Sequence, residues 1–530
     1  MFDKMTPNQR LLVAVLISIV FFVAYTAIFP PQEPVKAAQE PQKTQISGQV
    51  SVEQVSGHAI SEAEKVDAAA SNDIVVIKNE KFILKIDSLG RISSKELLEE
   101  KFRDAEDLHA QIIPQNGTKP LFVRFLDKEL NVAAMKTPYT ASVSEVDLQN
   151  DKPVEVILTQ SLEQMTVTKH LKFYADGHYD VNLQTSKPAR FYVYIGDRPK
   201  ITEQMMTVVG SMIYTNEGVA HITEDGDAEG RKVYQDVALA SSFDQYTATI
   251  MYGFKADTNV IVERGFDNNP VVYFEAENNR EFHGYIGPKE HKVLKAINPV
   301  LVNAIEYGWF TFAAKPLFAL LSWLHGIFGN WGWAIIALTA IIRAVLYPLT
   351  HKGMMSMQKI KELAPALKEI KEKYGKDPQR MNAATMEMYK KHGANPLGGC
   401  LPMLLQIPVF FAIYRVLLNA VELQGAPWML WIDDLSRMDP YYILPILMGA
   451  SMYYQQRLTP NNFTDPMQEK IFKYLPVIFT FFFITFPSGL VLYWFVNNLF
   501  SIAQQFVVNQ QFKNAKDAKA ALEKKAGNNK

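Results

Sequence analysis

The 530-residue chain has almost no cysteine, since Cys400 is its single thiol and lies in an apolar run. A disulfide framework is therefore excluded, whichever compartment the protein occupies. The sequence also lacks a GxxxxGK[ST] phosphate loop, a paired CxxC and an HExxH motif. Nothing in it indicates a bound nucleotide, a metal or another cofactor, and we expect no enzyme activity.

The chain also has almost no net charge, and this balance hides a strong segregation along the sequence. The formal charge is −1, and hydrophobic residues make up 48% of the chain. The apolar residues are concentrated in the first 30 positions and after residue 300. This distribution predicts several domains, some in a membrane and one outside it.

Residues 1–30 contain an apolar run, Leu11 to Phe29, that follows Lys4 and Arg10. The run is longer than the roughly 7–15 residues of a signal-peptide core, and no A-x-A cleavage site follows it. We therefore expect an uncleaved transmembrane span with a cytoplasmic N-terminus, because flanking positive charge stays inside. A cleaved signal peptide is the alternative.

Residues 31–72 are rich in proline, glutamine, serine and alanine and have no aromatic residue, which predicts a disordered periplasmic linker. Residues 73–297 differ, because alternating strand-like runs recur in them and Asp176-Gly177 marks a hairpin between two such runs. We expect a largely antiparallel β-sandwich there, with SSKELLEEKF (residues 93–102) as the main helical exception. Its six histidines show no ligand spacing and are interpreted as ordinary strand and loop residues.

Residues 298–330 are apolar and aromatic but are interrupted by Gly308, Lys315, Pro316 and His325. A spanning helix needs about 20 mostly apolar residues. We therefore expect an amphipathic helix on the outer membrane surface, with a kinked additional span as the alternative.

Residues 331–510 begin with a membrane span, Trp333 to Thr350, that contains Arg343. An arginine inside a hydrophobic helix costs roughly 2.5–3.5 kcal/mol on insertion scales, so protein or water must surround it. Thr339 lies one turn earlier on the same face. This pattern predicts a polar cavity, and an arginine that snorkels to the headgroups is the alternative.

Four further apolar runs follow, at 397–421, 441–455, 471–486 and 490–508, which gives six spans in total. The segment 351–395 has ten Lys and Arg residues, whereas 422–440 has only Arg437, so positive charge falls on the cytoplasmic side. Residues 511–530 form a basic tail, which places the C-terminus in the cytoplasm. Arg415 is interpreted as a snorkelling arginine near the outer end.

Several spans carry polar residues, and most of these lie in the last one. A single amide is best explained by interhelical hydrogen bonding. Together with Arg343, the set can line a groove open to the cytoplasm. The candidate groove residues are Thr339, Arg343, Gln406, Gln456, Tyr493, Trp494, Asn497, Ser501 and Gln504.

The segment 351–395 predicts a basic helical hairpin that Gly375 to Pro378 interrupts. A docking surface for a substrate chain, a lipid face or ribosomal RNA is one interpretation, and a solvated topology signal is the other. The candidate hairpin residues are Met357, Ile360, Leu367, Lys368, Lys371 and Tyr374.

Several stretches resemble the YidC/Oxa family of membrane protein insertases: the run from KEIKEKYGKDPQRMN to LLQIPVFFAIYRVL, and DPYYILPILMGASMYYQQ, TDPMQEKIFKYLPVIF and FPSGLVLYWFVNN. The N-terminal span, the linker and the β domain resemble the long form of Gram-negative bacteria. The resemblance implies an inner-membrane insertase and foldase with five core spans and a groove closed on the outer side. It also implies a galactose-mutarotase-like periplasmic domain, and an aromatic substrate contact at Trp494.

The partners that this resemblance implies are nascent membrane proteins, the Sec translocon, the ribosome and the signal recognition particle receptor, in contact with membrane lipids. We expect the protein to work as a monomer. Two other functions stay open: a transporter or channel in which Arg343 binds an anion, and a carbohydrate-processing enzyme anchored by the first span. The apolar outer halves of the spans disfavour the first, and the five further spans disfavour the second.

Overall fold

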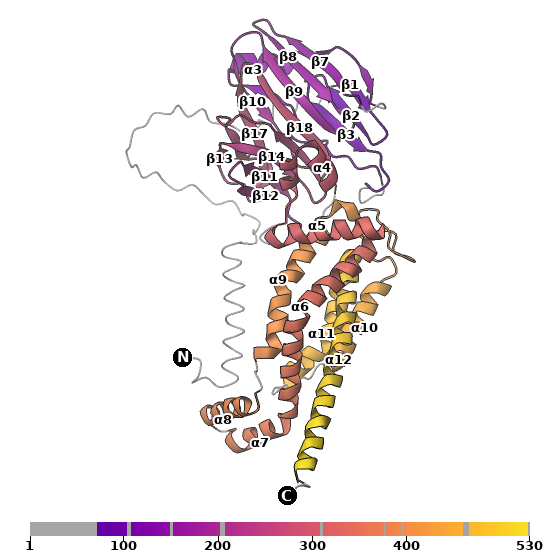
Figure 1. Ribbon diagram of the computed structural model, residues 1–530. Helices are drawn as coiled ribbons and strands as arrows, with labels where there is room; N and C mark the ends of the chain where they lie inside the picture. Colours follow the sequence, from indigo (N-terminus) through magenta and orange to yellow (C-terminus); the bar gives the residue numbers. More distant parts are fainter. Residues whose placement is uncertain are drawn as a thin grey trace, which may run out of the picture. The chain divides into compact units, whose positions relative to one another are not determined.

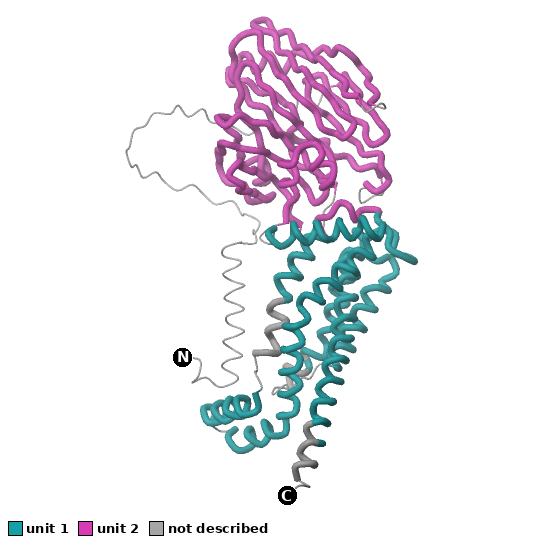
Figure 2. The backbone as a smooth tube through the Cα atoms, in the orientation of Figure 1, with its two compact units in different colours: residues 1–44, 309–417, 426–530 teal, residues 45–308, 418–425 magenta. Residues whose placement is uncertain are grey.

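The computed structural model describes residues 72–102, 108–148, 152–201, 207–307, 311–375, 377–393, 397–458 and 466–527. They form two compact units (Figure 2). Of the described residues, the β unit contains 72–307 together with 418–425, and the helical unit contains 311–417 and 426–527. The predicted first span and nearly all of the predicted linker lie outside the described residues.

Three sheets make up the β unit (Figure 1). The largest has the order β12 (Ala220–Glu224), β11 (Gly210–Thr215), β14 (Val237–Phe243), β15 (Thr247–Tyr252), β18 (Arg280–Pro288), β9 (His178–Thr185), β8 (Thr166–Phe173), β7 (Val154–Ser161), β5 (Thr140–Ala141). The second has the order β13 (Arg231–Tyr234), β16 (Val260–Arg264), β17 (Pro270–Glu277), β10 (Arg190–Tyr194), β4 (Val123–Phe125). The third has the order β3 (Ile92–Leu97), β2 (Phe82–Asp87), β1 (Asp73–Lys78), β6 (Glu145–Asp147).

The pairing is antiparallel between neighbouring strands, except that β1 and β6 run parallel. The predicted hairpin joins β8 to β9, where Gly177 takes a φ of 93° that favours glycine. Side chains alternate between core and surface along these strands, as in β8 and β9. The prediction of a largely antiparallel β-rich domain is therefore confirmed.

The helix expected in SSKELLEEKF is absent from the structure, and this prediction was wrong. Its first half lies in strand β3, which pairs with β2 in antiparallel register. The helical spacing of Leu97, Leu98 and Phe102 is outweighed by tertiary packing, because the side chains of Leu97 and Lys95 are buried. The helices of the β unit lie elsewhere, as α3 (Lys128–Lys136) and α4 (His291–Ile297), with 3₁₀ turns η2 (Phe266–Asn268) and η3 (Pro299–Ala304).

Residues 418–425, which begin with the last two residues of the helix Leu397–Asn419, belong to the β unit. Val421 is in the same buried cluster as the strand side chains. The Gln245 amide donates to the Leu418 carbonyl at 2.7 Å, and the Glu422 carboxylate accepts from the His291 backbone N–H at 2.9 Å. This segment, which includes η5 (Val421–Leu423), is therefore both packed and hydrogen-bonded within the β unit.

The described helices of the helical unit follow the predicted apolar runs. They are α5 (Thr311–Phe328), α6 (Trp331–Glu362), α7 (Ala364–Tyr374), α8 (Pro378–Lys391), α9 (Leu397–Asn419), α10 (Ile443–Leu458), α11 (Pro466–Phe483) and α12 (Ser488–Gly527). Helix α12 packs against both α6 and α10, and α11 packs against α10. Gly449 allows the last of these contacts, because a Cβ there would overlap Thr480 of α11.

Helix α6 is longer than the predicted span, since it continues through about the first quarter of the expected hairpin, to Glu362. Pro348 does not end it. The helix ends only before Pro365, whose ring would clash with the carbonyl four residues earlier. The hairpin itself is therefore α7 and α8, which pack on each other at one end of the helical unit (Figure 1).

Helix α5 lies crosswise to α6 and the helices that pack with it (Figure 1). By length and hydropathy, the described helices that could cross a membrane include α5, with α6 and the Ser488–Ala518 part of α12. Shorter apolar stretches, Gln406–Asn419 and Phe472–Phe483, lie in α9 and α11. The surface position of α5 and the total of six spans stay predictions.

Candidate substrate groove

Arg343 lies in the middle of α6 and is bound to the facing side of α12. Its Nε donates to the Asn497 side-chain oxygen at 2.8 Å. Its Nη2 donates to the Asn497 carbonyl at 3.1 Å and to the Ser501 hydroxyl at 2.5 Å. The arginine thus turns toward protein groups at mid-helix, and the snorkelling alternative does not describe this conformation.

The positive charge of Arg343 has no acidic partner in the described part of the chain. All three of its hydrogen-bond acceptors are neutral, and Asn497 and Ser501 are buried while Arg343 itself is half-buried. Neutral dipoles replace part of the hydration of a guanidinium but leave its charge uncompensated. This arrangement can therefore attract a further anionic group.

The polar contacts continue along the same two helices toward α7. The Gln504 amide donates to the Thr350 hydroxyl at 2.5 Å, and the Gln358 amide donates to Asn509. These residues extend the polar stripe, defined here as Arg343, Asn497, Ser501, Thr350, Gln504, Gln358 and Asn509, from mid-helix to the hairpin end. The predicted spacing of Asn497, Ser501 and Gln504 on one face is present in the structure.

Two expected groove residues take local roles instead. Thr339 is 1% exposed, and its hydroxyl donates to the Ile335 carbonyl of its own helix at 2.7 Å. Gln456 donates to the Phe472 carbonyl of α11 at 2.5 Å. Gln406 is half-buried on α9. The polar stripe brings none of these three together with Arg343.

Aromatic side chains occupy the region next to the polar stripe on α12. Trp494 lies one turn before Asn497 and Asn498, and its ring centroid is 4.7 Å from that of Phe410 and 5.1 Å from that of Phe483. Tyr493 is 3% exposed. A polar stripe with an apolar aromatic cluster beside it offers contacts for a chain that has both a polar and an apolar segment.

At the end of the helical unit opposite α7 and α8, hydrogen bonds hold the segment between α9 and α10 (Figure 1). The N–H of Ser488 donates to the Arg437 carbonyl at 2.7 Å, and that of Gly489 donates to Leu435 at 2.8 Å. The Asp439 carboxylate accepts from the Leu444 N–H at the start of α10 at 2.6 Å. The segment between α9 and α10 is therefore fastened across the α11–α12 turn.

Two family models match the chain. The model described as "60Kd inner membrane protein" matches residues 323–516, and the "YidC periplasmic domain" model matches residues 74–320. The chain belongs to the YidC family. It is accordingly an inner membrane protein with a periplasmic β-rich domain.

Relatives in other bacteria match this chain over nearly its whole length. The "Membrane protein insertase YidC" of Wolinella succinogenes is 46% identical over 98% of each chain. The proteins of the same name from Campylobacter jejuni and Helicobacter pylori (strain 26695) are 45% and 42% identical, and each match covers at least 96% of both chains. The YidC family membership therefore applies to the whole chain.

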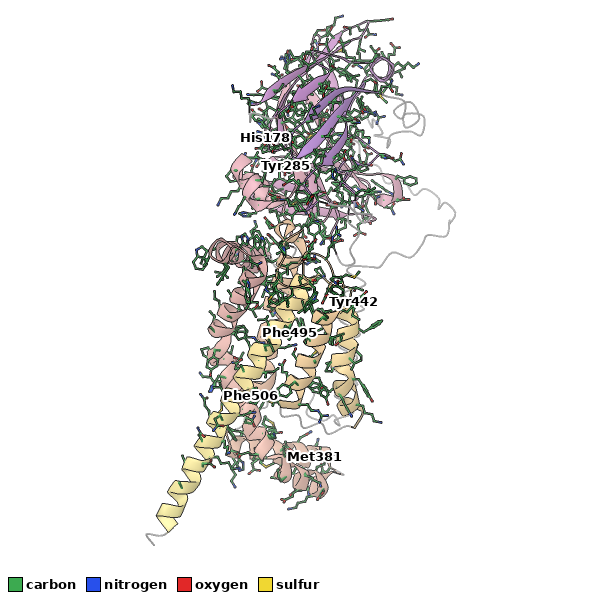
Figure 3. All side chains as sticks on the ribbon, turned by 90° about the vertical axis from the view of Figure 1, so that its right-hand side faces the viewer. His178, Tyr285, Met381, Tyr442, Phe495 and Phe506 are labelled. Atoms are coloured by element: carbon green, nitrogen blue, oxygen red, sulfur yellow. The ribbon has the colours of Figure 1, made fainter. Side chains whose placement is uncertain are left out.

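The predicted hairpin residues of this YidC family member are divided between two helices. Met357 and Ile360 lie on the extension of α6, while Leu367 and Tyr374 lie on α7, and all four are half-buried. Lys368 and Lys371 are exposed on α7. Met381, which is labelled in Figure 3, is half-buried on α8. Helices α7 and α8 are neighbours, and Lys368 and Lys371 lie on the exposed side of α7.

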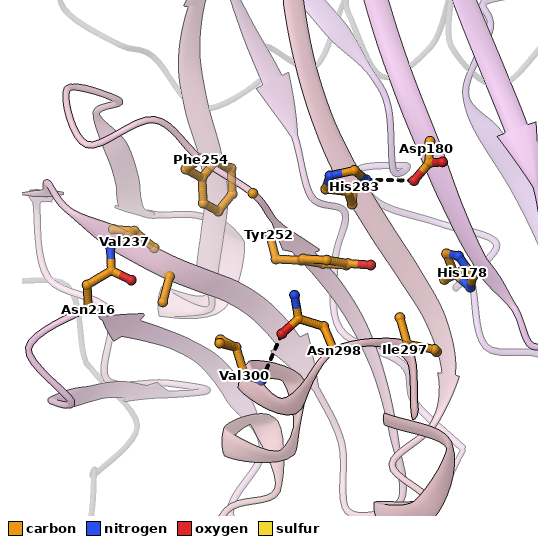
Figure 4. A pocket seen from close by; sticks show the side chains of 12 residues that line it. His178, Asp180, Asn216, Val237, Tyr252, Phe254, His283, Ile297, Asn298 and Val300 are labelled. Carbon is orange, nitrogen blue, oxygen red and sulfur yellow. Dashed lines mark hydrogen bonds and ion pairs between the residues drawn. The ribbon is translucent and has the colours of Figure 1, made fainter. Parts of the chain in front are cut away.

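Sequence reasoning missed a cavity of about 450 Å³ in the β unit (Figure 4). His283 Nδ1 lies 2.6 Å from the Asp180 carboxylate, which also accepts from the Tyr174 hydroxyl at 2.7 Å, and His178 pairs with Asp176. Two histidines interpreted as ordinary therefore line one polar cavity. Their separation in sequence gave no signal, and the described residues contain no group of three potential ligands for a metal ion.

Proposed function

We propose that this chain is a membrane protein insertase and foldase that works through the polar stripe between α6 and α12. Its YidC relatives are named for membrane protein insertion. The observation that carries the proposal is the uncompensated charge of Arg343 among neutral acceptors. In this mechanism the hydrophilic tail of a nascent chain enters the stripe from the cytoplasm, and its acidic residues are attracted to Arg343.

The stripe lowers the cost of bringing polar groups into the bilayer. A polar group without a hydrogen-bond partner in an apolar medium costs several kcal/mol, roughly 2–7 depending on the reference state. Side chains of the stripe and water supply such partners. The apolar segment of the substrate then passes into lipid along the aromatic side, and its burial drives the step without a nucleotide.

The remaining parts of the proposal concern orientation and partners. We infer that α7, α8 and both termini face the cytoplasm. Lysines are exposed on α7 and on the tail, and the positive-inside rule associates such positive charge with the cytoplasmic side. The basic hairpin then receives chains from the ribosome or the signal recognition particle receptor. Work alongside the Sec translocon, action as a monomer and a galactose-mutarotase-like β domain are parts of the same proposal that the family resemblance suggests.

The test uses a single-span substrate with either an acidic tail or the same tail with each Asp and Glu changed to Asn and Gln. Insertion is measured as protease protection of the tail in proteoliposomes. We expect Arg343→Ala to insert acidic tails poorly and neutral tails nearly normally. Arg343→Lys should retain part of the preference, because it keeps the charge but loses the planar fork. Equal insertion of acidic tails by Arg343→Ala and the parent protein would remove Arg343 from this role.

A further inference from the structure

Adjacent amides of α12 point in different directions. Asn497 faces α6 and accepts from Arg343, whereas Asn498 faces α10 and donates to the Ser451 hydroxyl at 3.1 Å and the Met448 carbonyl at 3.4 Å. Both side chains are at least nine-tenths buried. Asn497 therefore binds the arginine of α6, whereas Asn498 links α12 to α10.

The contacts of Arg343 use a defined part of its guanidinium. A guanidinium has five N–H groups: one on Nε and two on each Nη. The Nε–H is taken by the Asn497 side chain, and Nη2 is taken by the Asn497 carbonyl and Ser501. Within the described residues, the two N–H groups of Nη1 have no acceptor.

The N–H groups of Arg343 that already have acceptors determine how a carboxylate can bind. A bidentate grip needs two parallel N–H groups from one edge, either Nε with Nη2 or Nη1 with Nη2. Both edges include Nη2, which is occupied. A substrate carboxylate can therefore bind only through Nη1, which attracts it without the stronger two-point grip, and a chain in transit must be released again.

We propose that Asn497 is a positioning residue that holds Arg343 so that only Nη1 is free for the carboxylates of a substrate tail. This inference rests on the proposed function and assigns the substrate preference to a pair of residues in place of Arg343 alone. The Asn497 carbonyl contact survives any side-chain change at this position. The Nε–Oδ1 bond is consequently the part that substitution removes.

Two substitutions at Asn497 test the charge and the position of the Arg343 guanidinium separately. Asn497→Ala keeps the charge of Arg343 but releases Nε, so the guanidinium loses its fixed orientation. Asn497→Asp keeps an acceptor oxygen for Nε and adds a negative charge at about the same place, so the position is kept and the charge is offset. Asn498→Ala is the matched control, because it removes an equally buried amide of the same helix.

The measurement is the ratio of acidic-tail to neutral-tail insertion in proteoliposomes that contain equal amounts of each full-length variant. We expect Asn497→Ala to lower this ratio by about tenfold, the effect of losing one hydrogen bond to a charged group. Asn497→Asp should lower it as far as Arg343→Ala does. Asn498→Ala should change the two tails equally, if at all, and leave the ratio intact.

The outcomes distinguish this inference from the proposed function. If Arg343→Ala lowers the ratio and the two Asn497 variants do not, then Asn497 is merely structural and the inference is overturned. A higher ratio in Asn497→Ala would also overturn it, since it would mean that Asn497 competes with the substrate. If Arg343→Ala leaves the ratio unchanged, the proposed function fails first.

Discussion

At the scale of single residues, the β unit contains lysines that are buried as deeply as its leucines. Lys95 is 1% exposed, its Nζ lies 3.9 Å from the centre of the Phe82 ring, and it donates to the Ile286 carbonyl. Burial lowers the pKa of Lys95 to about 7, and the charge of Asp176 offsets this only in part. A large share of the amine is therefore deprotonated in the folded protein near neutral pH.

This burial predicts a pH dependence with a definite sign. Between pH 7 and about 10.5 the unfolded chain binds a proton at Lys95 that the folded protein does not, so the free energy of unfolding rises with pH in that window. We expect the urea midpoint of the β unit to increase from pH 7 to pH 9. Pulse proteolysis of the full chain at graded urea concentrations measures it.

Lys95→Met provides the control, because it fills nearly the same volume without a titratable group. Its urea midpoint should rise less steeply with pH, and some dependence should stay because burial also lowers the pKa of Lys169 to about 7. An unchanged slope in Lys95→Met would show that Lys95 does not titrate in this range.

The groove residues show how far sequence reasoning extends at this scale. Arg343, Asn497 and Ser501 could be found because a charge in an apolar span needs partners, and helical spacing shows which polar residues share a face. The direction of Thr339 could not be found, because its hydroxyl can satisfy its own helix as well as a groove. Spacing on one helix does not reveal which neighbouring helix each face meets.

At the scale of elements, the extension of α6 is the feature that the sequence pattern did not reveal. The apolar period of the span and the amphipathic period of the following segment are both helical, so the boundary between them left no signal before Pro365. The α6 extension also carries Gln358, which donates to Asn509 of α12. The hairpin therefore follows directly on the part of α6 that is hydrogen-bonded to α12.

This division allows the hairpin to be tested without disturbing the helix pair. Replacing residues 364–391 with a short Gly/Ser linker removes α7 and α8 but keeps the Gln358–Asn509 contact. We expect the variant to accumulate in the membrane and to lose insertion, because the substrate has no surface at which to arrive. Insertion is scored by tail protection, and accumulation is scored by quantitative immunoblotting.

A charge variant serves as the matched control for the deletion. Lys368→Gln with Lys371→Gln keeps both helices and removes two exposed cations of α7. If the hairpin acts as a basic docking surface, this variant should insert less well, with a deficit that shrinks as salt is raised, because salt also screens the two lysines of the parent protein. Normal insertion by the linker variant would mean that the hairpin is only a topology signal.

At the scale of the whole molecule, the polar stripe and the β unit are separate bodies with separate cores. The stripe, the aromatic cluster and the hairpin all belong to the helical unit. The polar cavity with His178 and His283 belongs to the β unit. Composition alone predicted this separation, since the apolar residues are segregated along the sequence. The return of residues 418–425 to the β unit could not be predicted, because the apolar run 397–421 does not show where the helix passes from one unit to the other.

The last prediction concerns removal of the β unit. Deleting residues 73–304 and joining the ends with a flexible linker should leave insertion largely intact, because no residue of the polar stripe lies in that range. The same deletion uncovers Val421 and Leu423, which are 1% and 0% exposed in the intact unit. We therefore expect the simple deletion to accumulate poorly, since newly exposed apolar surface favours aggregation.

Adding Val421→Ser and Leu423→Ser should restore the amount of protein, and insertion per molecule should then match the full chain. Restored accumulation without insertion would instead show that the β unit takes part in the insertion step itself.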